Sequence, residues 1–176
     1  MKTRHVLSVL VENRFGELAR VVGLFSGRGF NIDSLAVNIT LDPTYSRIVL
    51  TTRGNEVIIE QIIKQLRKLV RVKKVVLMSD DMRFLERELC VVTVAASSSQ
   101  TRQELERIVK LAGARVIAYS ATAFTVETTA TSAEIDEFID LLRPLGIKEM
   151  VRSAPIAIPR PVVVEAPSDS MPPPPP

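Results

Sequence analysis

The sequence predicts an α+β fold built from two consecutive ferredoxin-like units, each with the element order βαββαβ. Two observations lead there: segments with alternating apolar residues take turns with segments at helical spacing, and the same six-element order occurs twice. With 176 residues, 46% of them hydrophobic, the chain can build two small cores. We expect units at residues 4–79 and 83–158, followed by a disordered, proline-rich tail at residues 159–176.

Hydrophobic periodicity defines the elements of the first unit. Residues 5–12 read as a strand, and residues 16–28 as a helix with apolar side chains at i, i+3, i+4 and i+7. Asn55 suits the N-cap of the second helix, and Gly27-Arg28-Gly29 ends the first. The remaining elements are a strand at 30–41, a turn at Asp42-Pro43-Thr44, a strand at 45–53, a helix from 55 or 56 to 70 and a strand at 72–78.

The second unit repeats this order without evident sequence identity to the first. Thr101 and Glu104 are expected to form a capping box, and Gly113 to stop the same helix. Nine of the eleven prolines fall between Pro155 and Pro176, so we expect neither helix nor sheet ladder there. The elements are a strand within 85–97, a helix at 101–112, strands at 115–120 and 123–129, a helix at 132–142 and a strand at 147–153.

Residues that catalysis needs are few in this chain. His5 is the only histidine and lies at the edge of the first strand. Cys90, in an apolar strand, is expected to be a buried hydrophobe, which fits a reducing cytoplasm. Asp80-Asp81 and the pair Glu86 and Glu88 read as solvated linker residues rather than metal ligands. Without a P-loop or GxGxxG motif either, we expect no enzyme, no metal and no cofactor on this chain.

Nucleic acid and membrane are both unfavourable partners. The net charge is +3, but the dense basic run from Lys64 to Lys74 reads as a solvated helix face. RNA-recognition modules with this element order stack bases on aromatic side chains of the first and third strands. Here those strands are aliphatic, with Tyr45 only at the margin, so an RNA-binding module stays as a weak alternative. Their aliphatic faces imply a sheet covered by helices. No apolar run approaches the ~18–20 residues that span a bilayer.

The most site-like feature is a glycine-containing loop at the start of the first helix, which we expect to lie close to the start of the next strand. Helix N-terminal N–H groups suit a carboxylate, and Gly16 lets a ligand approach the backbone. Asn31 offers a carboxamide and Ile32 an apolar wall, so the corner suits a small zwitterion. The residues leave an alternative open: Asn13 as an N-cap and Asn31 as a turn residue, with no ligand.

Five segments carry a family resemblance: LSVLVENRFGELARVVGLFSGRGFNIDSLAV (7–37), DPTYSRIVLTT (42–52), EQIIKQLRKLVRVKKV (60–75), ERELCVVTV (86–94) and LLRPLGIKEMVRS (141–153). Together they resemble the small, regulatory subunits of acetolactate synthase, also called acetohydroxyacid synthase. The resemblance covers about residues 4–160 and implies an N-terminal ACT domain. One departure is Arg152-Ser153-Ala154, where the family usually reads Arg-Thr-Gly, and a glycine lost there would affect how the last strand exits.

The resemblance implies a function in valine, leucine and isoleucine biosynthesis. Such a subunit activates a separate catalytic subunit and confers feedback inhibition by valine. Thiamine diphosphate, FAD and Mg²⁺ are then expected on the catalytic subunit, and none on this chain. The alternative within the same fold is a stand-alone amino-acid-sensing ACT protein.

The resemblance also implies where the effector and the partners bind. ACT domains of this type pair side by side as homodimers, so a valine site would draw on both chains. The turn Asp42-Pro43-Thr44, with Arg47, is our hypothesis for the contact with the catalytic subunit. The implied valine-binding residues are Asn13, Phe15, Gly16, Leu18, Asn31 and Ile32.

Overall fold

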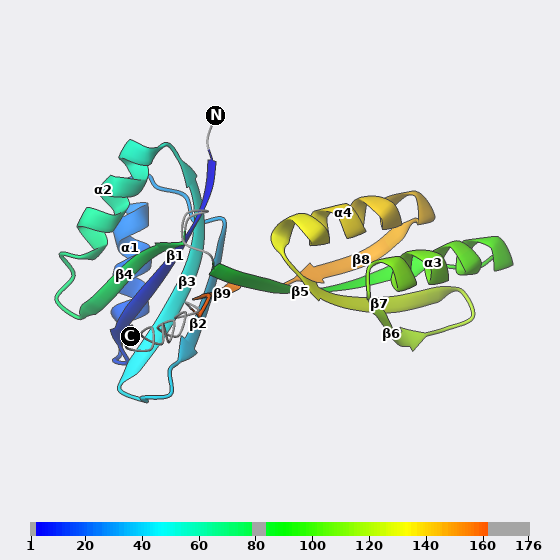
Figure 1. The fold of residues 1–176 in the computed structure, drawn as a ribbon, viewed down its shortest axis with the longest axis horizontal. Helices are drawn as coiled ribbons and strands as arrows, with labels where there is room; N and C mark the ends of the chain where they lie inside the picture. Colours follow the sequence, from blue (N-terminus) through cyan, green and yellow to red (C-terminus); the bar gives the residue numbers. More distant parts are fainter. Residues whose placement is uncertain (1–2, 79–83, 162–176) are drawn as a thin grey trace, which may run out of the picture.

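The computed structural model describes residues 3–78 and 84–161, which form two α+β units side by side (Figure 1). In the first unit the sheet order is β2-β3-β1-β4, with every neighbouring pair antiparallel. The predicted βαββαβ order is confirmed. Its elements are β1 (Thr3–Glu12), α1 (Glu17–Ser26), β2 (Ser34–Ile39), β3 (Tyr45–Gly54), α2 (Glu56–Leu66) and β4 (Val72–Met78).

The second unit has the same architecture. Its main sheet has the order β6-β7-β5-β8, so each strand occupies the position of its counterpart in the first sheet. The predicted duplication of architecture is therefore confirmed. The elements are β5 (Phe84–Ala95), α3 (Ser99–Leu111), β6 (Arg115–Tyr119), β7 (Ala123–Ala130), α4 (Ser132–Leu142), the short 3₁₀ helix η1 (Arg143–Leu145) and β8 (Ile147–Arg152).

Each unit has its own hydrophobic core between one sheet face and two helices. In the first unit, Leu7 and Leu50 from the sheet meet Phe25 of α1 and Ile62 of α2, all fully buried. In the second unit, Cys90 lies in the core, and burial raises the pKa of its thiol. The expectation of a buried cysteine is confirmed.

The helix-free face of the first sheet is covered by a two-stranded ribbon. The N-terminal part of β5 pairs with an additional strand, β9 (Ile156–Pro159), beside the first unit (Figure 1). Ala157 of β9 and Phe84 of β5 pack with Val6 and Val49 of the first sheet. The prediction that helices cover this sheet's aliphatic faces is right for one face and wrong for the other.

The prediction that the proline-rich segment forms no ladder is also wrong, for residues 156–159. Pro155 precedes β9 and Pro159 is its last residue, and prolines at strand ends and on edge strands need not donate to a ladder. Residues 162–176 of the predicted tail lie outside the described residues, as does Asp80-Asp81. Ala154 fits without strain, because no non-glycine residue of the described ranges has a positive φ.

Several element ends differ from the prediction. The strand predicted at 30–41 is shorter, because Gly29 takes a left-handed conformation (φ 68°) and residues 27–33 form a connector. The N-cap of α3 is Ser98 rather than Thr101, while a capping box joins Thr131 and Glu134 at α4. Asn55 caps α2 as predicted, although that helix ends at Leu66. No helix in the described ranges is long and apolar enough to cross a membrane.

Candidate functional site

The N-terminus of α1 is not capped by any side chain. Gly16 is the N-cap, with φ 84°, and no side chain accepts a hydrogen bond from the first turn. A Cβ on Gly16 would meet nothing within 4 Å, so the left-handed backbone, rather than crowding, is what favours glycine. The Glu17 N–H donates to the carbonyl oxygen of Arg14 (3.4 Å), so the N–H groups of Leu18 and Ala19 are the ones in the first turn that are available to an anionic ligand.

A buried carboxylate lies in the first turn of the same helix. Glu17 is only 4% exposed, and its Oε1 accepts hydrogen bonds from Arg20 (3.0 Å) and Arg71 (2.8 Å). The two guanidinium groups offset its negative charge beside the helix N-terminus. A second anion at the corner is consequently not repelled by an unpaired carboxylate.

Asn13 is not an N-cap. Its backbone N–H donates to the carbonyl oxygen of Thr44 (2.7 Å), and its Nδ2 donates to the carbonyl oxygen of Pro43 (3.0 Å). The capping alternative for Asn13 is therefore wrong. The side chain is exposed, and its Oδ1 and second N–H make no hydrogen bond within residues 3–78 and 84–161.

Asn31 lies in the connector between α1 and β2. Its Nδ2 donates to Oδ1 of Asp33 (2.6 Å), whose other oxygen accepts from Nε of Arg53 (3.0 Å). The carbonyl oxygen of Asn31 accepts from the hydroxyl of Thr52 (2.6 Å). Ile32 is half-buried against the first core. Asn31 is thus a connector residue with an exposed carboxamide that follows the turn at residues 27–29.

The structure does not bring Asn13 and Asn31 together within one chain. Asn13 follows Glu12, which pairs with Tyr45, whereas Asn31 contacts Thr52, which pairs with His5. The two pairs are seven positions apart along β1, about 24 Å at the rise of an antiparallel strand. The expectation that the loop lies close to the next strand is therefore wrong. The physical reason is that α1 runs back along β1, so β2 starts at the opposite end of the sheet.

Apolar side chains are exposed next to this corner and along one edge of the first sheet. Phe15 is fully exposed, and Leu18 and Val22 continue an apolar row along α1. β2 is an edge strand that carries no charged side chain, and Val37 and Ile39 on it are exposed. Edge strands of monomeric domains are usually protected by charges, prolines or a covering element. This edge is suited to pairing with another chain.

The predicted contact residues for the catalytic subunit separate into two places. The turn Asp42-Pro43-Thr44 lies against Asn13 through the two hydrogen bonds described above. The Asp42 carboxylate accepts from the hydroxyl (2.7 Å) and backbone N–H (2.9 Å) of Thr44, and these bonds lower the pKa of Asp42. Arg47 instead lies on β3, beside an apolar groove that includes Leu85 and Ile158 of the ribbon.

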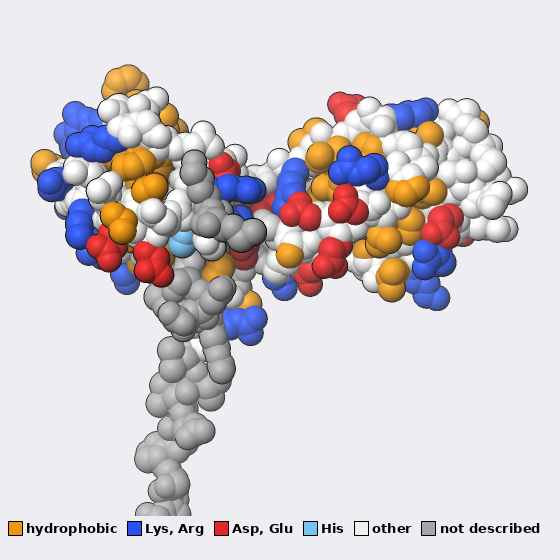
Figure 2. All heavy atoms as spheres, turned by 90° about the horizontal axis from the view of Figure 1, so that it is seen from above, with side chains coloured by type: hydrophobic (Ala, Val, Ile, Leu, Met, Phe, Trp, Pro, Cys, Tyr) orange, Lys and Arg blue, Asp and Glu red, His pale blue; other side chains and the backbone are white. Residues whose placement is uncertain are grey.

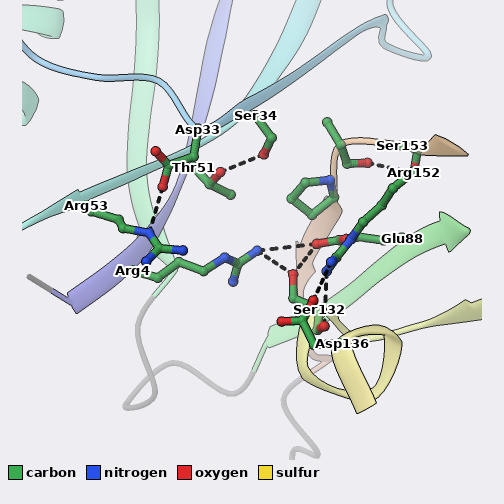
Figure 3. Close-up of a pocket in the computed structure, with 12 residues that line it drawn as sticks. Arg4, Asp33, Ser34, Thr51, Arg53, Glu88, Ser132, Asp136, Arg152 and Ser153 are labelled. Carbon is green, nitrogen blue, oxygen red and sulfur yellow. Dashed lines mark hydrogen bonds and ion pairs between the residues drawn. The ribbon is translucent and has the colours of Figure 1, made fainter. Parts of the chain in front are cut away.

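A polar cleft between the two units is a feature that sequence reasoning missed (Figure 3). Arg4 of β1 donates to Glu86 (3.3 Å through Nη1) and to the hydroxyl of Ser132 (2.8 Å). Glu88, 4% exposed, pairs with Arg152 and lies 3.5 Å from Arg4. The prediction that Glu86 and Glu88 are solvated linker residues is wrong. Their alternate spacing with buried Cys90 is the signal that would have placed them on a buried strand face.

Charged side chains form no single basic patch on the face shown in Figure 2. Lys and Arg occur on both units, with Asp and Glu among them. The lysines of β4 include Lys73, which bonds Glu12 (2.8 Å) and lowers the pKa of that carboxyl. Because the helix-free sheet face is covered by the β5–β9 ribbon, it offers no open platform for bases.

Comparison with known proteins decides the family. Residues 7–74 match the family described as "AHAS small subunit-like ACT domain", and residues 87–161 match "Small subunit of acetolactate synthase". A probable acetolactate synthase small subunit of Methanothermobacter thermautotrophicus is 42% identical over 156 residues, covering 89% of this chain and 92% of the relative. The chain belongs to the acetolactate synthase small-subunit family. Its first unit is accordingly an ACT domain, as the resemblance implied.

Other members of the acetolactate synthase small-subunit family agree. The isozyme 3 small subunit of Escherichia coli is 40% identical over 158 residues, covering 89% of this chain and 96% of the relative. The crystal structure of the acetolactate synthase small subunit from Thermotoga maritima matches with a TM-score of 0.79 at 33% identity. That match covers 90% of this chain and 98% of the other. Both units are therefore common to the family.

Proposed function

We propose that this chain is the regulatory subunit of a cytoplasmic acetolactate synthase and that valine is its effector. The observation that supports this most is the open corner: α1 begins at Gly16 without a side-chain cap, next to the exposed carboxamide of Asn13. A carboxylate suits the helix N–H groups, and an ammonium suits an Asn oxygen. Leu18 and Ile32 are the apolar residues for an isopropyl group.

The site is completed by a second copy of the chain. Two β2 edges that pair antiparallel about a two-fold axis place the start of one strand opposite the end of the other. The end of β2 leads into the turn that contacts Asn13. The two-fold axis thereby brings Asn31 of the partner subunit toward Asn13, although the two residues lie far apart within one chain. The uncharged β2 edge and exposed Phe15, Leu18 and Val22 support this homodimer.

The regulatory role requires a catalytic partner. In this proposal the chain activates the catalytic subunit, and valine binding reverses that activation. Thiamine diphosphate, FAD and Mg²⁺ belong to the catalytic subunit. The exposed turn Asp42-Pro43-Thr44 is the proposed contact, and Arg47, on the ribbon side of β3, is a second one.

The test is a charge placed where the ligand carboxylate binds. Gly16→Asp puts a carboxylate at the α1 N-terminus, and Gly16→Asn is its control, with nearly the same shape and the same left-handed strain but no charge. In an assay reconstituted with the catalytic subunit, we expect Gly16→Asp to keep activation and lose valine inhibition. Gly16→Asn should retain more of the valine inhibition than Gly16→Asp does. Undiminished valine inhibition in Gly16→Asp contradicts the assignment.

A stand-alone amino-acid sensor predicts a different result. Such a protein binds valine but does not copurify with a thiamine-dependent enzyme or change its activity. Titration of the isolated chain with each branched-chain amino acid, followed by reconstitution, separates the two functions. Activation of the catalytic subunit by this chain at equimolar concentration is the outcome we expect.

A further inference from the structure

The effector corner, which is the loop at residues 13–16 together with the start of α1, is directly connected to the turn at residues 40–45. Asn13 reaches that turn twice, with its backbone N–H on the carbonyl of Thr44 and its carboxamide on the carbonyl of Pro43. The turn is braced from within: the Asp42 carboxylate accepts from Thr44, and the Thr40 hydroxyl donates to the carbonyl of Asp42 (2.8 Å). Every described hydrogen bond from the loop at residues 13–16 to this turn is therefore made by Asn13.

The second unit has the same connection with a different side chain. The backbone N–H of Ala96, which follows β5, donates to the carbonyl of Thr122 in the β6–β7 turn (2.9 Å). Arg102 of α3 then bonds the carbonyls of both Ala96 (3.0 Å) and Ala121 (2.6 Å). The backbone tie is thus a property of the fold. In the second unit a helical arginine fixes it, whereas in the first an exposed carboxamide holds it.

We propose that Asn13 transmits effector occupancy to the turn at residues 40–45. One N–H of its carboxamide already donates to Pro43, which leaves the other N–H and the oxygen for a zwitterionic ligand. A ligand that bonds either group fixes the side chain at both ends and so orders the turn. This inference rests on the proposed function, because it requires an amino acid in the corner.

Ordering by a ligand has a reciprocal consequence. If an occupied corner orders the turn, a turn that is already ordered binds the ligand more tightly, by the same factor. A change that loosens the turn at a residue outside its contact with Asn13 must therefore weaken binding of the ligand. Asp42 is such a residue, because its carboxylate accepts hydrogen bonds from Thr44 and makes none with Asn13.

Hydrogen exchange of the full chain with and without L-valine is the first test. We expect valine to slow exchange of the first-turn amides of α1 and of the amides of Thr44 and Tyr45 in the turn. Slowed exchange at α1 with an unchanged or faster turn overturns this inference while leaving the proposed function intact. No slowing at α1 or anywhere else contradicts the proposed function itself.

A pair of turn variants is the second test. Asp42→Ala removes the brace of the first turn, and Ser120→Ala is its control, because the Ser120 hydroxyl braces the β6–β7 turn by accepting from the N–H groups of Thr122 and Ala123. We expect Asp42→Ala to raise the Kd for valine by about fivefold, the lower end of usual couplings, and Ser120→Ala to leave it unchanged. Equal affinities in both variants and the unaltered chain overturn the proposal, provided that sedimentation shows the same oligomeric state.

Discussion

The two units share one fold, but they differ at the corner where the first helix of each unit begins. At the start of α1 the N-cap is Gly16 and no side chain caps the helix, whereas Ser98 caps α3 through the N–H of Thr101 (3.0 Å). The connector after α1 holds Asn31, whereas the connector after α3 is Ala112-Gly113-Ala114, without a polar side chain. Arg102 also bonds the loop at the second corner.

This difference teaches that the ligand site resides in the loops rather than in the fold. At the second corner Ser98 accepts from the Thr101 N–H, and Arg102 bonds the carbonyls of Ala96 and Ala121, so fewer groups there are left for a zwitterion. The first corner leaves helix N–H groups and a carboxamide available, and its stability does not depend on a cap. We therefore expect effector binding in the ACT domain alone.

The largest expected effects come from weakening one core at a time. Ile62→Ala in the first core and Ile135→Ala in the second each remove a fully buried side chain and should lower the free energy of unfolding by about 2–5 kcal/mol. The chain has no Trp and two tyrosines, Tyr45 in the first unit and Tyr119 in the second. Urea unfolding followed by tyrosine fluorescence in Tyr45→Phe and Tyr119→Phe backgrounds assigns each transition.

Valine makes this measurement a test of the comparison. A ligand stabilises only the unit that binds it, so valine should shift the transition reported by Tyr45 to higher urea. The transition reported by Tyr119 should shift less, most clearly in Ile135→Ala. A larger shift at Tyr119 breaks the comparison, because it places the effector in the second unit.

The next effect concerns the contact that joins the units. Arg4→Met removes the hydrogen bonds to Glu86 and Ser132 and should destabilise the chain by roughly 1.5–3 kcal/mol, as expected for bonds to a charged group. The two tyrosine-reported transitions should move apart. Adding Glu86→Leu removes the carboxylate left without Arg4 and should recover part of the loss. If Arg4→Met unfolds like the unaltered chain, the cleft does not hold the units together.

A smaller effect is expected at the closed corner. Ser98→Ala removes the cap of α3 and should lower the unfolding free energy by about 1 kcal/mol. Valine affinity should stay the same, because the second corner binds no effector. Calorimetric titration and thermal unfolding of this variant check both statements. A change in valine affinity beyond twofold would show that the corners are not independent.

The smallest effects are in the titration of two exposed carboxylates, one from each unit. Hydrogen bonds from Thr44 lower the pKa of Asp42 below its usual 3.8, and hydrogen bonds from Thr131 lower the pKa of Glu134 below its usual 4.5. Both groups thus stabilise the folded chain above those values, and this stabilisation is lost as the pH falls through the lowered folded pKa. Carboxyl NMR titration should place both midpoints below the usual values. Saturating valine should lower the midpoint of Asp42 further and leave that of Glu134 unchanged.

The sequence was sufficient for the order of the elements, because alternating and helical periodicities are local signals. Asn55 is the clearest success at the level of one residue, since a cap depends on the neighbouring backbone. The same reasoning failed for Thr101, because Ser98 three residues earlier competes for the same helix start. Local sequence patterns do not decide between two candidate N-cap residues that are one helical turn apart.

Long-range features were beyond local patterns. Glu86 and Glu88 are buried because Arg4 and Arg152 pair with them from distant parts of the sequence. β9 forms because β5 extends past its own sheet and offers it a partner. The distance between Asn13 and Asn31 follows from topology, which no residue type signals.

Calorimetric titration of the full chain with L-valine tests the central claim most directly. The account predicts saturable binding with no more than one valine per chain, lost in Gly16→Asp and unaffected by Ser98→Ala. Two valines per chain, or binding that persists in Gly16→Asp, would contradict it.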